Sequence, residues 1–166
     1  MKEITSGQFS FEPFEKLKKE WALVSAGTED AFNTMTVNWG GFGELWFKSV
    51  ATIYIRPSRY THEFLDAQDY FSICFLKPGN EAALKLCGAQ SGRDGDKTAK
   101  AGLTPIFPDG IPAFSQAEYI LLCKKLYAQE IRRECFCDSS VFDASYANGD
   151  CHTMYIGEVV KVLENR

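Results

Sequence analysis

The chain has 166 residues with a formal charge of −4, and 45% of its residues are hydrophobic while 24% are charged. This composition excludes disordered and fibrous proteins, and the length fits one domain with a full core, which we expect to span 1–166. The acidic balance also argues against a nucleic-acid partner, because such partners are held by many lysine and arginine contacts to phosphate.

Hydropathy and cysteine usage predict a cytoplasmic protein with no membrane partner. The first twenty residues lack the apolar stretch of a secretory signal, and no apolar run approaches the roughly 18 residues needed to cross a bilayer. Without an export signal, the cysteines are expected to be reduced thiols rather than disulfides. They are Cys74, Cys87, Cys123, Cys135, Cys137 and Cys151.

We expect no metal site. Cys135 and Cys137 are separated by one residue, whereas zinc-binding cysteines are usually separated by roughly two to four, and only His62 and His152 could add imidazole ligands. A thiol or metal-binding barrel stays open as an alternative that metal analysis would decide. Its ligands would be Cys87, Cys135, Cys137 and Cys151.

Segments rich in β-branched and aromatic residues predict strands over 21–27, 34–40, 49–55, 70–76, 117–131 and 151–163. Short helices are predicted over 13–20, 60–68 and 80–88. Long helices do not alternate with these strands, so a mainly β, closed antiparallel barrel with peripheral helices is favoured over a parallel doubly wound sheet. The connection 88–115 shows no core segment, and loops of that length are usually functional.

The stretch RPSRYTHEF, 56–64, carries arginines where a helix opening usually carries acidic residues. Arg56 and Arg59 offer two charged groups, and Ser58 and Thr61 offer hydroxyls beside the free amides of a helix start, which together suit a phosphate. The alternative is a solvated loop whose arginines pair with nearby carboxylates. Both interpretations stay open on this stretch alone.

A second candidate anion loop is SGRDGDK, 91–97. Its glycines free the backbone to fold around a ligand, while Ser91, Arg93 and Lys97 supply donors. Asp94 and Asp96 offset that charge, so a solvated turn is the alternative.

Two further features would suit a bound cofactor. In a strand, Thr34 and Thr36 share one face and Met35 the other, so a planar heterocycle could lie along this segment, although an ordinary half-exposed strand explains it as well. His152 could donate a hydrogen bond or proton, although a single histidine is more often structural.

The chain lacks nucleophile-elbow, HExxH and P-loop motifs, so covalent or zinc hydrolysis has no support.

Four segments occur in an order that resembles the flavin reductase-like proteins of the FMN-binding split-barrel class, which includes flavoredoxin. They are NTMTVNW (33–39), VATIYIRPSRYTHEFLDAQDYFSICFL (50–76), SGRDGDK (91–97) with GLTP (102–105), and GDCHTMYIGEVV (149–160). The resemblance implies a six-stranded antiparallel Greek-key split barrel that forms a homodimer, with one FMN per subunit near the interface.

The resemblance also implies roles for individual residues. The phosphate side would be formed by Arg56, Ser58, Tyr60 and Thr61, with Ser91 and Lys97 closing over it. The segment beside the isoalloxazine ring would be Asn33, Thr34, Met35 and Thr36, with Val50 and Ala51 on the neighbouring strand. His152 would lie near the cofactor, with a role toward nicotinamide or flavin.

The implied function is an FMN-dependent oxidoreductase that takes electrons from NAD(P)H or a reduced protein and passes them to a second small-molecule or protein acceptor. The alternative is a non-catalytic FMN-binding electron-transfer protein. Phe42, Trp46 and Phe47 stand where the family often has small residues. They are expected to cover the flavin face and narrow access, which would favour the alternative.

Overall fold

The computed structural model describes residues 1–165, apart from the side chain of residue 13. Its main sheet has eight strands, all paired antiparallel: β1 (Lys2–Ile4), β2 (Ala22–Gly27), β3 (Phe32–Val37), β4 (Gly40–Leu45), β5 (Lys48–Ile55), β6 (Tyr70–Leu76), β9 (Ala117–Glu130) and β10 (Thr153–Glu164). A small second sheet pairs β7 (Pro105–Ile106) with β8 (Ala113–Phe114). The helices are α1 (Pro13–Glu15), α2 (Tyr60–Ala67), α3 (Glu81–Ala89), α4 (Lys97–Lys100) and α5 (Ser139–Ser145).

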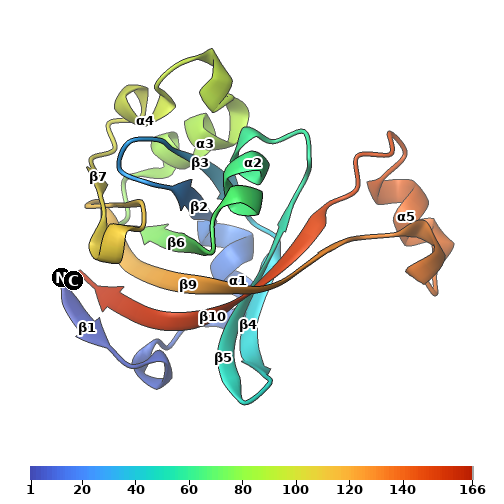
Figure 1. Cartoon of the computed structure of the whole chain (residues 1–166), viewed down its shortest axis with the longest axis horizontal. Helices are drawn as coiled ribbons and strands as arrows, with labels where there is room; N and C mark the ends of the chain where they lie inside the picture. Colours follow the sequence, from blue (N-terminus) through green and yellow to red (C-terminus); the bar gives the residue numbers. More distant parts are fainter. Residues whose placement is uncertain (166) are drawn as a thin grey trace.

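The strand order is β3-β2-β6-β9-β10-β5-β4, with β1 added beside β10. Although β3 and β5 lie far apart in this order, they come into contact, so the sheet curls into a barrel. Figure 1 shows α2, α3 and α4 gathered on the side of β2, β3 and β6. The expected mainly β antiparallel class with peripheral helices is therefore confirmed.

The expected count of six strands was too low. β4 was missed because its sequence, GGFGEL, contains three glycines, which weaken strand propensity. β1 was missed because it has only three residues. The helix predicted over 13–20 is also interrupted, because α1 gives way to a π-helical turn at Lys16–Glu20.

The barrel interior is filled by one side of each strand. Ala51, Ile53 and Ile55 of β5 belong to this core, as their alternation in the sequence predicts. A second apolar cluster fills the space between the outer face of the sheet and α3. Leu103, Ile111 and Phe114 are buried in it, so the expectation that 88–115 lacks a core segment was wrong.

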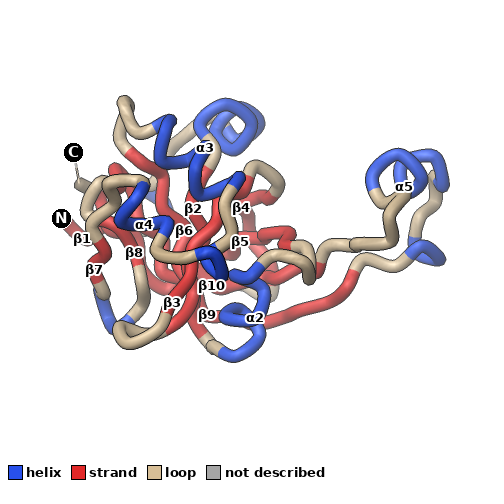
Figure 2. The backbone as a smooth tube through the Cα atoms, turned by 90° about the horizontal axis from the view of Figure 1, so that it is seen from above, coloured by secondary structure: helices blue, strands red, loops and turns tan. Residues whose placement is uncertain are grey.

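The connection between β9 and β10, residues 131–152, leaves the barrel and is called the arm below. Figures 1 and 2 show that the arm, with α5 near its end, extends away from the rest of the chain. It has its own small cluster of buried residues, Phe142, Tyr146 and Cys151, against which Ile131 and Phe136 pack.

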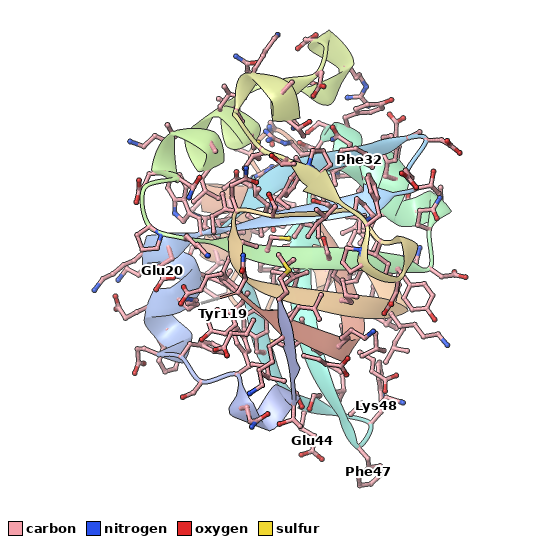
Figure 3. All side chains as sticks on the ribbon, turned by 90° about the vertical axis from the view of Figure 1, so that its left-hand side faces the viewer. Glu20, Phe32, Glu44, Phe47, Lys48 and Tyr119 are labelled. Carbon is pink, nitrogen blue, oxygen red and sulfur yellow. The ribbon has the colours of Figure 1, made fainter. Side chains whose placement is uncertain are left out.

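The hairpin between β4 and β5 turns at Trp46 and Phe47, whose φ angles are 55° and 57°. Two positive φ angles are typical of a type I′ turn, where Asn-Gly is the usual sequence. Phe47 is 100% exposed, and Figure 3 shows it at the tip of the hairpin. Phe42 instead packs against the barrel core. The packing of Phe42 against the core does not match the expectation that it covers a ligand face, whereas that expectation for Trp46 and Phe47 stays a prediction.

No helix in the described part of the chain is both long enough and apolar enough to span a membrane.

Candidate functional site

The candidate site begins where β3 meets the first turn of α2. Asn33 and Thr61 are both buried, and the Asn33 Nδ2 atom donates a hydrogen bond of 2.8 Å to the Thr61 hydroxyl. The N-cap of α2 is Arg59, which has extended backbone angles and supplies no side-chain cap. The His62 amide donates to the Arg59 carbonyl oxygen at 2.9 Å, so within the described chain the amides of Tyr60 and Thr61 are left for another acceptor, and helix starts favour anions.

The loop at 91–97 lies against this corner. A Cβ atom added to Gly92 would lie 2.0 Å from the Asn33 Oδ1 atom, so only glycine allows this approach. The Ser91 hydroxyl accepts a hydrogen bond from the Arg93 amide at 3.2 Å. Between the loop and α2 lies a pocket of about 360 Å³, whose lining includes Asn33, Tyr60, Phe64, Gly92, Lys97 and Thr98.

Two cations meet beside this pocket, at the carboxyl end of α3. Lys97 is only 4% exposed, and its ammonium group donates to the carbonyl oxygens of Gln90 at 3.1 Å and Cys87 at 3.3 Å. The Arg59 guanidinium donates to the carbonyl oxygen of Gly88 at 2.6 Å. Burial lowers the pKa of Lys97, and the positive charge of Arg59 lowers it further. Among residues 1–165, neither cation forms an ion pair with a carboxylate.

Arg56 and Ser58 face the arm instead. The Arg56 guanidinium donates to the carbonyl oxygens of Asp150 at 2.5 Å and Ser145 at 3.1 Å, and it lies 5.3 Å from the centre of the Tyr146 ring. The Ser58 hydroxyl donates to the Asp150 carboxylate at 2.6 Å. The stretch 56–61 thus has one end at the arm and the other at the Lys97 pocket.

The residues of β3 alternate as predicted, but their hydroxyl groups have partners within the protein. Thr34 is buried and donates to the carbonyl oxygen of Val24 at 3.1 Å, while Thr36 donates to that of Leu84, in α3, at 2.6 Å. Met35 lies in the barrel core. On β5, Ala51 lies in the same core and Val50 is buried on the opposite face.

His152 lies just before β10 in a second polar cluster. Its Nδ1 atom and the Tyr146 hydroxyl are 3.0 Å apart, and the centre of its ring is 5.0 Å from that of Trp39. Burial, assisted by the positive charge of Arg56, lowers the pKa of His152 to about 4. His152 is therefore neutral at neutral pH and can act as a hydrogen-bond donor rather than as a cation.

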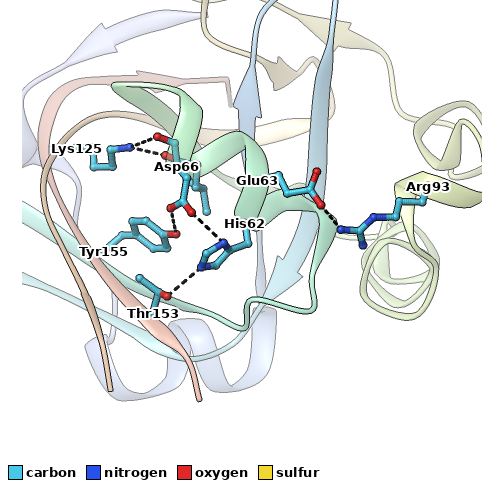
Figure 4. A network of polar contacts seen from close by, with 8 residues as sticks. His62, Glu63, Asp66, Arg93, Lys125, Thr153 and Tyr155 are labelled. Carbon is cyan, nitrogen blue, oxygen red and sulfur yellow. Dashed lines mark hydrogen bonds and ion pairs between the residues drawn. The ribbon is translucent and has the colours of Figure 1, made fainter. Parts of the chain in front are cut away.

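A third network ties α2 to β10 beside His152 (Figure 4). The two ring nitrogens of His62 lie 2.9 Å from the Thr153 hydroxyl and 3.2 Å from the Asp66 carboxylate. The Tyr155 hydroxyl donates to the same carboxylate at 2.6 Å. An ion pair between Arg93 and Glu63 joins the loop at 91–97 to the other side of α2. No group of three or more His, Cys, Asp or Glu residues in the described chain could hold a metal ion.

The sequence predicted no role for Trp39 or Tyr146, and it predicted Arg59 as one of the charged groups that suit a phosphate, although the resemblance assigned Arg59 no role. Arg59 had a signal, because it lies in the same arginine-rich helix start as Arg56. No sequence signal indicated Tyr146, because only the folded path of the arm brings it next to His152.

A family model described as "Flavin reductase like domain" matches residues 14–166. No curated protein matches the chain. Among solved structures, the FMN-binding protein from Thermus thermophilus is 22% identical with a TM-score of 0.70, over 98% of this chain and 78% of that one. A flavoredoxin from Methanosarcina acetivorans is 16% identical with a TM-score of 0.71, over 100% and 77%.

The NADH:FAD oxidoreductase of Streptomyces globisporus is 20% identical with a TM-score of 0.67, over 88% of this chain and 75% of that one. At these identities the structural likeness shows the fold alone. The family model covers most of the chain, and on that ground the chain belongs to the flavin reductase-like domain family.

Proposed function

We propose that this protein binds FMN and acts as an oxidoreductase that passes electrons from NAD(P)H, through the flavin, to a second acceptor. The observation that carries the proposal is the pair of cations at the carboxyl end of α3, because Lys97 is buried and neither Lys97 nor Arg59 has a carboxylate partner within the described chain. A buried charge without a counter-ion is costly, and a phosphate would supply the counter-ion.

The surroundings of these cations suit the FMN phosphate. Gly92 lets the loop at 91–97 approach β3, and the start of α2 offers uncapped amides on the other side. The pocket between them has about 360 Å³, within the usual range for small-molecule sites, and because Glu29, Asp30 and Asp96 also line it, the phosphate would lie at its Lys97 end. Arg59, Thr61, Ser91 and Lys97 would hold the phosphate, whereas Arg56 and Ser58, which the resemblance implies on the phosphate side, contact the arm.

FMN, when bound, supplies the hydride and electron chemistry, so the protein has to position it and admit a donor. His152 and Trp39 form the second part of the proposed site, where a neutral imidazole donates a hydrogen bond. Trp39 is 47% exposed and so presents ring surface to an incoming partner. Phe42 lies against the core, which supports an uncovered flavin face within the subunit.

The relatives support both parts of the proposal. One similar structure is an FMN-binding protein and another is an NADH:FAD oxidoreductase, as their names state. A cytoplasmic location, where thiols stay reduced, also fits the six free cysteines.

We also propose a homodimer in which the β4–β5 hairpin tip contacts the second copy. Trp46 is 51% exposed and Phe47 fully exposed, and the Trp46 ring lies 6.3 Å from that of Tyr127, which is itself 38% exposed. Large exposed aromatic side chains that gather in one place are typical of protein interfaces. A twofold axis would bring the same patch from each subunit together.

The test is to purify the protein, load it with FMN and mix it with NADH or NADPH without oxygen. Prompt loss of the flavin absorbance is expected with at least one of the two. FMN binding without reduction by either nucleotide would contradict the enzyme and favour an electron-transfer protein with a protein donor. Failure to bind FMN would contradict the whole proposal.

A further inference from the structure

Two of the six cysteines differ from the rest in exposure. Cys135 and Cys137 are exposed on the arm, whereas the other four cysteines are buried. Burial raises the pKa of Cys74 to about 11 and also raises the pKa of Cys87 and Cys123. Those three thiols therefore stay protonated and unreactive at neutral pH, since the thiolate is the reactive form.

The residue between the two exposed cysteines packs into the arm. The ring centre of Phe136 lies 5.3 Å from that of Phe142 and 6.3 Å from that of Tyr146. Cys135 ends a 3-10 turn, and the chain continues through Phe136 in an extended conformation, with φ −82° and ψ 120°. Both thiols remain exposed while the side chain between them is held in the arm cluster.

A pocket adjoins the first of these two cysteines. It has a volume of about 260 Å³, and its lining includes Cys135, Ile131, Phe136, Met154, Arg132 and Gln129. This volume lies just below the roughly 300 Å³ at which drug-sized sites begin. The pocket therefore suits one small compound with an apolar part and a polar part, held beside the Cys135 sulfur.

We propose that Cys135 and Cys137 form a thiol–disulfide exchange site for a small-molecule disulfide. Cys135, as its thiolate, attacks one sulfur of the disulfide, so the substrate S–S bond breaks and one small thiol leaves with a proton. Cys137 then attacks the Cys135 sulfur and releases the second small thiol. The protein pair loses two electrons and two protons in forming its own disulfide, and the substrate gains them. An external dithiol restores the reduced pair.

Two residues of fully extended chain span at most roughly 6.6–7.2 Å, whereas the Cα atoms of a disulfide usually lie about 4.4–6.8 Å apart. A Cys135–Cys137 disulfide is therefore expected near the long limit of that range. A strained disulfide is reduced more easily than a relaxed one, as a turnover site requires.

The test uses the whole reduced protein, oxidised glutathione as the probe, and mass spectrometry of the intact chain and its peptides. Wild type is expected to release both halves of the probe and to carry a Cys135–Cys137 disulfide. Cys137→Ser is expected to accumulate a stable glutathione adduct at Cys135, because the resolving thiol is gone. The double variant Cys135→Ser, Cys137→Ser is expected to leave the folded protein unmodified.

Three results would overturn the proposal: no reaction of wild type, equal reaction of the double variant, or stable adducts on both thiols of wild type without a disulfide. Each measurement is made without flavin, so the outcome is separate from that of the FMN proposal.

Discussion

Lys97 and Arg59 bring their charged groups to the same carboxyl end of α3, with hydrogen bonds of 3.1 Å to the carbonyl oxygen of Gln90 and 2.6 Å to that of Gly88. Lysine and arginine side chains stabilise a helix end of this polarity by about 0.3–1 kcal/mol each. That gain is small beside the cost of burying an ammonium group. An anionic ligand between α3, α2 and the loop at 91–97 would account for the arrangement.

Arg59→Ala is expected to weaken FMN binding by about 1.5–3 kcal/mol, because it removes a charge-assisted contact to phosphate. Arg56→Ala is the matched comparison, since the Arg56 guanidinium donates to the carbonyl oxygens of Ser145 and Asp150 in the arm. We expect Arg56→Ala to lower stability toward urea and to weaken FMN binding less than Arg59→Ala. Fluorescence titration of FMN measures both affinities. The reverse order would show that the phosphate lies at Arg56.

Gly92→Ala is expected to destabilise the protein by about 1–3 kcal/mol and to weaken FMN binding, because the new methyl group would collide with the Asn33 side chain. Gly41→Ala is the control, since a Cβ atom at Gly41 meets nothing within 4 Å. Urea unfolding and FMN titration of the two variants test the fit of the loop. Equal behaviour of both variants would contradict this close approach.

The low pKa of His152 makes stability depend on pH. The folded protein keeps His152 neutral down to about pH 4, whereas the unfolded chain takes up the proton near pH 6.5. Between these values the unfolded state binds more protons, so stability falls as the pH falls from 6.5 to 4. The His152 contribution to this loss is about 3 kcal/mol.

His152→Gln keeps a polar side chain but removes this titration. Urea unfolding at pH 7 and at pH 4 should show a loss of stability that is smaller in the variant than in wild type. Equal losses would show that the imidazole is not buried as the structure has it.

We expect the turn at Trp46 and Phe47 to lower the stability of the hairpin and to support association of two subunits. Each non-glycine residue at positive φ costs roughly 1–2 kcal/mol, so Trp46→Asn with Phe47→Gly should stabilise the hairpin. The dimer of this double variant should dissociate into monomers at a higher protein concentration than the wild-type dimer, as measured by sedimentation. Glu44→Gln, on the same hairpin, should change neither property. An unchanged association would contradict the homodimer through this patch.

The sequence predicted most strands because their residues alternate or are densely apolar. β6 was predicted with its observed ends, and β5 within one residue. β4 was not predicted, since its stability comes from pairing with β5 along its full length rather than from its glycine-rich composition. The separate cluster under α3 was missed because Leu103, Ile111 and Phe114 are scattered through a segment rich in glycine and proline.

The candidate site was predictable in part. The helix start at 56–61 and the loop at 91–97 were two candidate anion loops, which stay a prediction, and the structure brings Thr61, Asn33 and Lys97 to one corner. The separation of Arg56 from that corner was not predictable, because its partners, Ser145 and Asp150, lie about ninety residues further along the chain. Tyr146 lies only six residues before His152, and its position beside the imidazole depends on the path of the arm.

The most direct test of the central claim compares the affinity of FMN with that of riboflavin, which lacks the phosphate. If Lys97 holds the phosphate, wild type binds FMN more tightly, and Lys97→Met lowers the ratio of the two affinities by roughly 10- to 100-fold, while Lys100→Met, on the same helix, leaves it unchanged. A ratio that stays the same in Lys97→Met, with both variants folded, would contradict the account.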